Sequence, residues 1–149
     1  MSANYKPATH PQIVPYLVLS DADNALDFVK KVFGAIEMRI SRDQRGQIGH
    51  GEVRIGDSVL MIGQASEQWP SSPAAIYVYV PDVDAAYQPA LDADAESMWQ
   101  PVNQPYGDRN GGVKDSNGVQ WWMATHLEEV SEEEEARRRA AKESAPAPA

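Results

Sequence analysis

The sequence predicts an α+β protein built from two consecutive βαβββ units. A run of apolar residues at 12–20, "QIVPYLVLS", is followed directly by a segment of helical periodicity and then by three short runs of strand type. The same order begins again at residue 74 with "AAIYVYV". Because a repeated order of elements indicates a duplicated structural unit, residues 12–63 and 74–126 are expected to form the two halves of one domain, 12–126.

The helix expected in the first unit has start and stop signals. Asp21 or Asp23 can accept hydrogen bonds from the free amides of a first helical turn, and Gly34 can adopt the left-handed conformation that ends a helix. Apolar residues recur every three or four positions between them. The runs that follow, "AIEMRIS", "GHGEVRIG" and "DSVLMIG", predict three strands of an antiparallel meander.

The second unit repeats this order with one irregularity. The segment "PDVDAAYQPALDAD" again opens with a capping aspartate, but Pro89 inside its helical pattern is expected to kink or shorten the helix. "ESMWQPV", "GGVKD" and "GVQWWMAT" supply the further strands. We interpret "NGG" at 110–112 as a turn or bulge, and the Asn-Gly pair at 117–118 as a tight hairpin turn.

The two ends of the chain are expected to lie outside this domain. Residues 1–11 form an N-terminal arm, and residues 127–149 form a charged helix with a disordered Ala-Pro tail. Ser131 and Glu134 fit a capping box, and Glu–Arg pairs follow at 133 and 137, 134 and 138, and 135 and 139. Since this helix has almost no apolar face, we interpret it as solvated rather than as a partner-binding helix.

The composition excludes several classes of function. The absence of cysteine rules out thiol catalysis, zinc–cysteine sites and disulfides. A net charge of −9 argues against nucleic acid as a partner and favours a neutral or cationic small molecule. No apolar run is long enough to span a membrane and no leader pattern is present, so we expect a cytoplasmic protein with no membrane partner.

Four stretches resemble a known superfamily. "VPYLVLSDADNALDFVKKVFGA", "GHGEVRIGDSVLMIG", "VYVPDVDAAY" and "YGDRNGGVKDSNGVQWWMATH" resemble the PhnB-like branch of the vicinal-oxygen-chelate superfamily. That superfamily contains glyoxalase I, bleomycin-resistance proteins and extradiol dioxygenases. The resemblance covers residues 12–130 and implies that the two units curl into a cup-shaped mixed sheet, the glyoxalase/bleomycin-resistance fold, around a cavity.

The resemblance also identifies the positions where enzymes of this superfamily hold a metal ion. Those enzymes use four strand ligands, usually histidine and glutamate, and the matching positions here are Val14, Met61, Ala75 and Trp122. Three of these side chains offer no lone pair, and a methionine thioether is a soft ligand. Shifting any strand by one residue restores no ligand set. We therefore expect no metal and no cofactor.

The adjacent residues Trp121 and Trp122 must point to opposite faces of their strand. With Trp122 in the cup, Trp121 is expected to pack under the helix of the second unit or at a subunit contact. The same alternation places further residues on the cup face: Val14, Tyr16, Val18, Met61, Ala75, Tyr77 and Tyr79. The aromatic rings on the cup face either line a ligand pocket or fill the cup as a closed core.

Polar candidates near the cup have several interpretations. His50 and Glu52 share one face of a strand and form a hydrogen-bonded wall, a ligand contact or the start of a metal site. His10 and His126 show no convergence with them. Arg109, in the expected loop "YGDR", either clamps an anionic group or pins the loop by pairing with Asp108 or another carboxylate.

The resemblance implies a metal-free binding protein and a homodimer whose interface forms part of the pocket. The aromatic cup suits an aromatic or cationic ligand. The residues expected to bind it are Val14, Tyr16, His50, Glu52, Met61, Tyr77, Tyr79, Trp99, Tyr106, Arg109 and Trp122. No catalytic residue is expected. The alternative is a glyoxalase-like lyase or isomerase, or a dioxygenase relative, that uses a non-standard metal site or acid–base catalysis at His50 and Glu52. A third hypothesis makes the aromatic face a dimer core.

Overall fold

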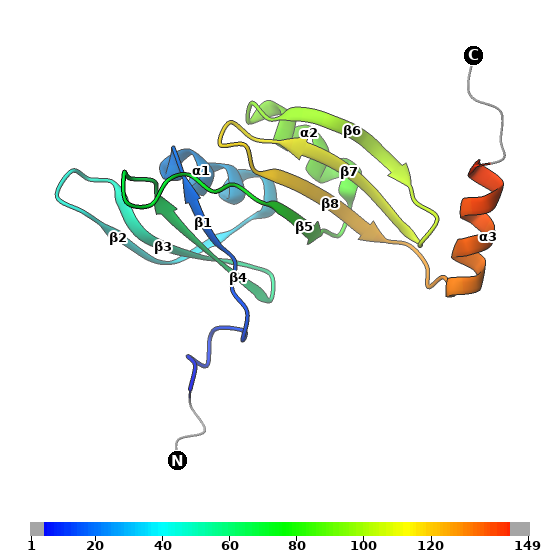
Figure 1. Cartoon of the computed structure of the whole chain (residues 1–149), viewed down its shortest axis with the longest axis horizontal. Coiled ribbons are helices and arrows are strands. Elements are labelled where there is room, and N and C mark those ends of the chain that lie inside the picture. Colours follow the sequence, from blue (N-terminus) through cyan, green and yellow to red (C-terminus); the bar gives the residue numbers. More distant parts are fainter. Residues whose placement is uncertain (1–4, 144–149) are drawn as a thin grey trace.

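The computed structural model describes residues 5–143 and contains two βαβββ units followed by a C-terminal helix (Figure 1). Unit one comprises β1 Tyr16–Leu19, α1 Ala22–Phe33, β2 Ile36–Arg42, β3 Ile48–Ile55 and β4 Ser58–Gln64. Unit two comprises β5 Ala75–Tyr79, α2 Val83–Asp92, β6 Glu96–Asn103, β7 Asp108–Lys114 and β8 Gln120–His126. The last helix is α3, Glu132–Glu143. The predicted α+β fold and its duplication are confirmed.

Each unit forms a four-stranded mixed sheet with the same topology. Sheet one has the order β1-β4-β3-β2 and sheet two the order β5-β8-β7-β6. In both, the first strand runs parallel to the last strand of the unit, and the others are antiparallel. The registers correspond, since Tyr16 pairs with Met61 in sheet one and Tyr77 with Trp122 in sheet two.

The helices begin and end at residues that the sequence indicates. Asp21 caps α1 by accepting a hydrogen bond from the Asn24 amide at 3.1 Å, and Gly34, with φ of +66°, ends it in the left-handed conformation. Asp82 caps α2. Pro89, expected to kink or shorten the helix, lies inside α2, which continues past it to Asp92. Proline removes one amide donor, and packing of the apolar face onto sheet two supports the helix across that gap.

Strand β7 is longer than the sequence indicates. Asp108 and Arg109, expected in a loop, pair with His126 and Thr125 of β8, and Asn110–Gly112 continue the strand instead of forming a turn. The register irregularities lie opposite, in β6. The glycines are explained by close approach, since a Cβ at Gly112 would stand 2.3 Å from the ring of Trp99.

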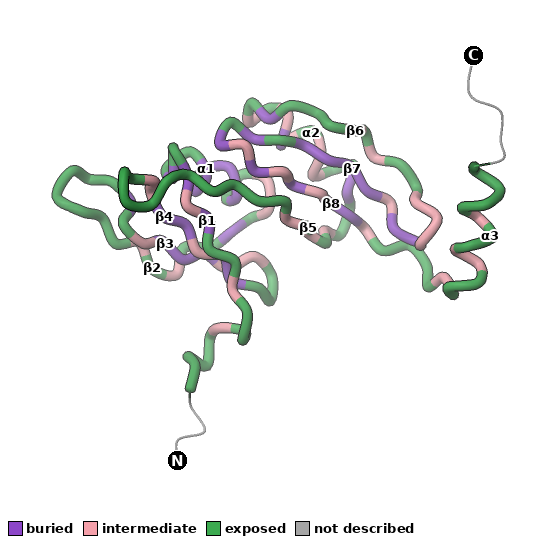
Figure 2. The backbone as a smooth tube through the Cα atoms, in the orientation of Figure 1, coloured by how far each residue is buried: buried purple, intermediate pink, exposed green. Residues whose placement is uncertain are grey.

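One face of each sheet is covered and the other is not. Helix α1 packs on sheet one and α2 on sheet two, and α1 also contacts α2 (Figure 1). Buried residues run along the central strands and the inner sides of the helices (Figure 2). The face of each sheet turned away from these helices is called its open face here.

The two units are joined through Trp121, which is fully buried. Its ring stacks on Phe28 of α1 with centroids 5.8 Å apart and also contacts Phe33 at 5.3 Å. Its indole N–H donates to the Asp115 carboxylate at 2.8 Å. Trp121 was expected under the second unit's helix or at a subunit contact; its aromatic neighbours come from α1 of the first unit.

The hairpin turn before β8 locks this joint. The predicted Asn-Gly turn is confirmed, with φ of +84° at Gly118. Asn117 reaches across to unit one, where its amide donates to the Asp21 carbonyl at 2.9 Å and its side-chain oxygen accepts from the Asp21 amide at 2.8 Å. The turn thus fixes the residue that caps α1.

Helix α3 stands beyond the end of β8, apart from both sheets (Figure 1). Ser131 caps it by accepting from the Glu134 amide at 3.1 Å. The predicted pairs at 134 and 138 and at 135 and 139 form, whereas Arg137 pairs with Glu134 instead of Glu133. Neither α3 nor any other helix within residues 5–143 is long and apolar enough to cross a membrane. The expected tail at 144–149 lies outside the described residues.

Replacing Trp121 by alanine should lower the free energy of unfolding by about 3–5 kcal/mol, because it leaves a cavity between the units and removes the donor to one oxygen of the buried Asp115 carboxylate. The matched control is Trp122→Ala, on the half-buried side of the same strand, for which we expect about half that loss or less. Denaturant unfolding measures both. Equal losses for the two variants would contradict the joint described above.

Candidate functional site

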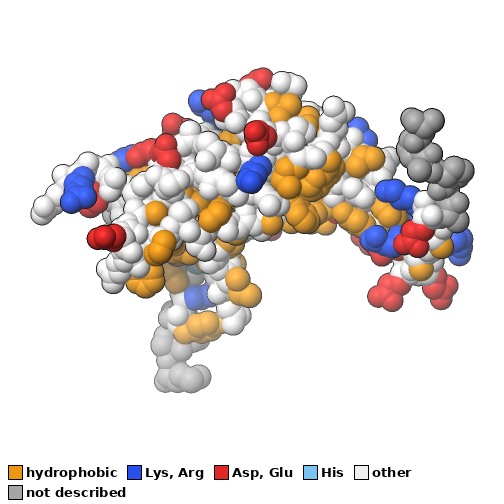
Figure 3. Space-filling view, turned by 45° about the horizontal axis from the view of Figure 1, so that its top comes forward, with side chains coloured by type: hydrophobic (Ala, Val, Ile, Leu, Met, Phe, Trp, Pro, Cys, Tyr) orange, Lys and Arg blue, Asp and Glu red, His pale blue; other side chains and the backbone are white. Residues whose placement is uncertain are grey.

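Aromatic rings on the open faces of both sheets are exposed to solvent. The exposed fractions are 46% for Tyr16 on sheet one, and 39% and 62% for Tyr77 and Tyr79 on sheet two. Apolar side chains gather along this side of the molecule (Figure 3). The aromatic residues therefore do not form a closed core within one chain.

Two tyrosines on sheet two are held by one buried carboxylate. The Asp108 side chain is 4% exposed and accepts from the Tyr77 hydroxyl at 2.7 Å, the Tyr79 hydroxyl at 2.9 Å and His126 Nδ1 at 2.7 Å. The two tyrosine rings meet edge to face with centroids 5.3 Å apart. The three donors engage both oxygens of Asp108, so it fixes these rings rather than offering a free charge.

Two tryptophans extend this surface. The rings of Trp99 and Trp122 are perpendicular, with centroids 5.5 Å apart. The Trp99 N–H donates to the side-chain oxygen of Asn110 at 3.1 Å, and the Trp122 N–H donates to Gln120 at 3.2 Å. Gly112 admits the Trp99 ring against the backbone of β7. The polar atom of each indole is thus bonded within the protein, so the exposed parts of these rings offer apolar and π surface.

Asn110 connects the members of this surface. It is 2% exposed, and its amide nitrogen donates to the hydroxyls of Tyr77 at 3.2 Å and Tyr106 at 2.8 Å. Its oxygen accepts from Trp99 and from Gln104. These four bonds use the full capacity of a primary amide. Tyr106 also lies 5.8 Å beneath the guanidinium of Arg139, which ties α3 to the site.

Hydrogen bonding controls the charges of this network. Burial alone would raise the pKa of Asp108, but the bonds from His126, Tyr77 and Tyr79 outweigh it, and the pKa lies below its usual range. The bond to Asp108 and a second to Glu129 raise the pKa of His126. Burial is the main cause of the raised pKa of Tyr77, and the bond to Asp108 is the main cause for Tyr79.

Sheet one carries a different group on its open face. The Tyr16 hydroxyl lies 3.2 Å from His50 Nδ1, and His50 Nε2 lies 3.0 Å from Glu52. His10 of the N-terminal arm bonds the second oxygen of Glu52. The His10 bond is the main reason that the pKa of Glu52 is lowered; burial opposes this shift and the His50 bond adds to it. The expectation that His10 does not converge with His50 and Glu52 is wrong, since His10 contacts Glu52. His126 instead contacts Asp108 on sheet two.

Other predicted residues lie at different places. Arg109 is engaged by Asp84 at the start of α2, with distances of 2.8 and 3.0 Å, and by Asn103, so it pins β7 to the helix. Val14 precedes β1 and is half-buried. Met61 is half-buried in β4, between its pairing partners Tyr16 and Glu52. Their contact with a ligand stays a prediction.

The side chains offer little for a metal ion. Within residues 5–143, no group of three or more histidine, cysteine or acidic side chains is arranged to hold one. The matched position on β5 and those on β4 and β8 carry Ala75, Met61 and Trp122, none of which suits the hard or borderline ions of the superfamily.

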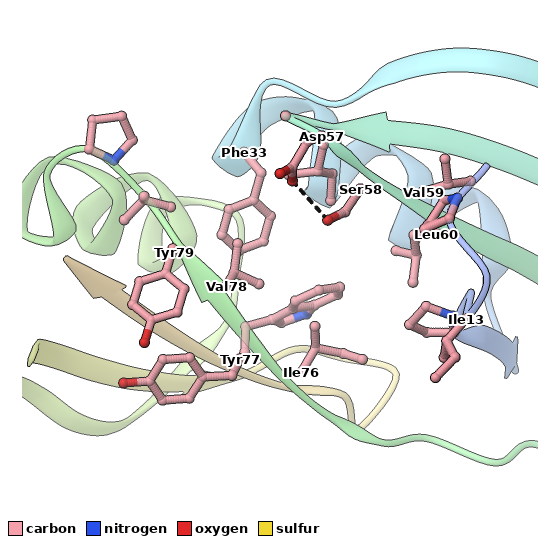
Figure 4. A pocket seen from close by; sticks show the side chains of 17 residues that line it. Ile13, Phe33, Asp57, Ser58, Val59, Leu60, Ile76, Tyr77, Val78 and Tyr79 are labelled. Atoms are coloured by element: carbon pink, nitrogen blue, oxygen red, sulfur yellow. Dashed lines mark hydrogen bonds between the residues drawn. The ribbon is translucent and has the colours of Figure 1, made fainter. Parts of the chain in front are cut away.

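A separate apolar groove runs between the units, with a volume of about 540 Å³. It lies beside β5, where Ile76 and Val78 face Phe33, Leu60 and Ile13 (Figure 4). Two polar side chains of the lining, Asp57 and Ser58, bond to each other (Figure 4). The lining includes Tyr77 and Tyr79 but none of Tyr16, Met61 and Trp122, so the groove is not the predicted cup.

Sequence reasoning missed Asp108, Asn110 and Gln104 as members of the site. Asp108 entered only as a partner for Arg109, and Asn110 only as part of a turn. The available signal was strand alternation, because extending β7 back to Asp108 would have placed Asp108 and Asn110 on one face.

Comparison with known sequences identifies a family. The family model described as the Glyoxalase/Bleomycin resistance protein/Dioxygenase superfamily matches residues 10–123. The chain is also similar to the uncharacterized protein Mb0911c of Mycobacterium bovis, with 33% identity over 145 residues that cover 90% of this chain and 93% of that protein.

Comparison of structures agrees with this result. TioX from Micromonospora sp. superposes with a TM-score of 0.67 at 25% identity, over 78% of this chain and 99% of TioX. A PhnB protein from Bacillus cereus gives 0.63 at 19% identity, over 77% and 99%. TnmS3, an antibiotic binding protein from Streptomyces sp., gives 0.61 at 20% identity, over 78% and 99%. At the identities of the last two, the likeness shows the fold alone. The predicted superfamily and fold are confirmed.

The pair of His126 and Asp108 should give a pH dependence of defined sign. Since the pKa of His126 is raised above 6.5, its protonated form stabilises the fold fully below that pH, and the contribution is lost as the pH rises through the folded-state pKa. NMR titration of the imidazole should show a midpoint above 6.5 that falls in Asp108→Asn. An unchanged midpoint in this variant would contradict the assigned contact. As the pH rises through this range, the free energy of unfolding should fall less in His126→Asn than in the native chain.

Proposed function

Because the chain belongs to the glyoxalase/bleomycin resistance protein/dioxygenase superfamily, we propose that it binds a flat aromatic or cationic small molecule, without a metal ion, on the open face of sheet two. One observation carries the proposal. Four rings lie together there, and the polar atom of every one is bonded to another group of the protein. What remains for a ligand is the π surface of the rings.

The hydrogen bonds also set the cost of binding. Tyr77 and Tyr79 are fixed by Asp108, and Trp99 by Asn110, so the rings need not lose rotamer freedom when a ligand arrives. A preorganised aromatic surface attracts cations through the negative faces of its rings. The net charge of −9 attracts them over longer distances.

A second copy of the chain completes the proposed site. An open sheet face covers one side of a ligand, whereas small-molecule sites usually bury most of the ligand surface. The open face of sheet one, with Tyr16 and Met61, supplies a second wall if it comes from a partner chain. The exposed rings on both faces support this arrangement, because monomers rarely leave such a surface uncovered.

The TnmS3 comparison gives the proposal a precedent within the fold, since that protein is described as antibiotic binding. Sequestration of a toxic compound is the corresponding role for this chain. The catalytic alternative keeps one favourable observation, the contact of Tyr16, His50 and Glu52. Its metal-dependent form finds no matching donor group within residues 5–143.

Ethidium, a flat aromatic cation, should quench the intrinsic tryptophan fluorescence with saturation. Tetramethylammonium carries the charge without the flat ring system, and should compete weakly. Replacing Trp122 by leucine removes a ring worth about 1–2 kcal/mol, which corresponds to roughly five- to thirtyfold weaker binding. The control Trp69→Leu changes an exposed tryptophan of the linker and should leave the affinity unchanged. Equal affinities for the native chain and Trp122→Leu would reject this surface as the site.

Sedimentation equilibrium should give about twice the chain mass of 16.4 kDa. A charge placed on the open face by Tyr79→Glu should shift the protein towards monomer, because it must be desolvated at the contact. The control Gln88→Glu places the same charge on the exposed side of α2 and should leave the dimer unchanged. A native chain that stays monomeric at high concentration would remove the partner from the proposed site.

A further inference from the structure

The open face of sheet one holds a continuous series of proton-carrying groups. The Tyr16 hydroxyl contacts His50 Nδ1 at 3.2 Å, and His50 Nε2 contacts Glu52 Oε2 at 3.0 Å. His10 bonds Glu52 Oε1, and Thr9 contacts the other ring nitrogen of His10 at 2.8 Å. Tyrosine, histidine and carboxylate thus stand in the order of a nucleophile or acid, a base and the group that orients the base.

The chemistry of these groups fixes the positions of the protons. Glu52 has a lowered pKa and, when ionised, only accepts hydrogen bonds. His50 must therefore donate from Nε2, and in its neutral form it accepts from the Tyr16 hydroxyl at Nδ1. The Tyr16 oxygen keeps its lone pairs free while its proton already points at a base.

The fold builds this arrangement from three separate segments. Tyr16 comes from β1, His50 and Glu52 come from β3, and His10 comes from the arm, whose Thr9 carbonyl accepts from Arg54 at 2.7 Å. Gly63 of β4 makes room for the tyrosine, because a Cβ there would lie 3.0 Å from the Tyr16 hydroxyl. A larger residue at position 63 would press on that hydroxyl.

The burial of the groups differs along the series. The side chains of His10 and Glu52 are 13% and 11% exposed, and that of His50 is 35% exposed. Tyr16 is 46% exposed. The protected carboxylate therefore lies at the inner end and the phenol at the end that meets solvent, as a group that exchanges a proton with a bound molecule requires.

We propose that Tyr16 is a metal-independent proton-transfer centre, supported by His50 and oriented by Glu52. Its substrates are small compounds with a C–H bond made acidic by a neighbouring electron-withdrawing group. The substrate proton passes to the Tyr16 oxygen as the Tyr16 proton passes to His50 Nδ1, and Glu52 stabilises the imidazolium that forms. The activity goes beyond the binding role on sheet two and does not depend on it.

The probe is 5-nitrobenzisoxazole, a flat compound that needs only a base to react. Its ring C–H proton goes to Tyr16, the N–O bond breaks, and the electron pair leaves on oxygen to give a coloured nitrile phenolate. At pH 7 the native chain should accelerate this step by about 100-fold or more over the same concentration of free imidazole. Tyr16→Phe, which removes one oxygen, should lose about tenfold or more of kcat/KM. The control Tyr87→Phe, on α2, should keep the rate.

Two further variants separate catalysis from folding. His50→Ala should be slow and should recover activity when imidazole is added, which a purely structural role would not allow. Glu52→Gln should lower kcat with little change in KM, as expected for a positioning residue. Each variant is compared with the native chain by circular dichroism and by its unfolding midpoint.

The outcomes divide clearly. A native rate equal to that of free imidazole overturns the proposal, and so does full activity in a folded Tyr16→Phe chain. Loss in Tyr16→Phe together with imidazole rescue of His50→Ala supports it. Loss of ethidium affinity in Trp122→Leu tests the ring surface of sheet two, and loss of the elimination rate in Tyr16→Phe tests sheet one, so failure of either proposal is recognised by itself.

Discussion

The stacking of Trp121 on Phe28 is the contact on which the rest of this structure depends. It joins the sheet of unit two to the helix of unit one, and its indole N–H is satisfied by Asp115. In the hairpin turn that precedes β8, Asn117 bonds to Asp21, the residue that caps α1. Because the units are joined through their helical sides, both open faces point away from the joint. Exposed aromatic surface is a direct consequence of this arrangement.

The two open faces differ in chemistry although their topology is the same. Sheet two presents rings whose polar atoms are all engaged, which suits binding by stacking. Sheet one presents a phenol in contact with an imidazole and a carboxylate, which suits proton transfer. Pairing sheet one of one copy with sheet two of another would place these surfaces opposite each other, so that a single ligand meets both.

Much of the fold was predictable because its signals are local. Strand alternation assigned Trp122, Tyr16, Tyr77 and Tyr79 to the open faces. Capping residues located the helix of each unit. Asp108, Asn110 and His126 were not recognised, because their partners lie up to 33 residues away and no spacing rule links them. Glycines at 111 and 112 suggested a turn, whereas a side chain there would press on Pro101 at position 111 and on the Trp99 ring at position 112.

The sequence by itself determined the duplicated units, the helix ends, the faces of the strands and the absence of suitable ligands at four matched positions. These depend on periodicity and on residue chemistry, which need no long-range information. Only the tertiary structure decided that α1 packs on Trp121, that the arm brings His10 to Glu52, and that Asp108 and Asn110 hold the aromatic rings. Each of these is a contact between segments far apart in the chain, and its geometry is set by how whole elements pack.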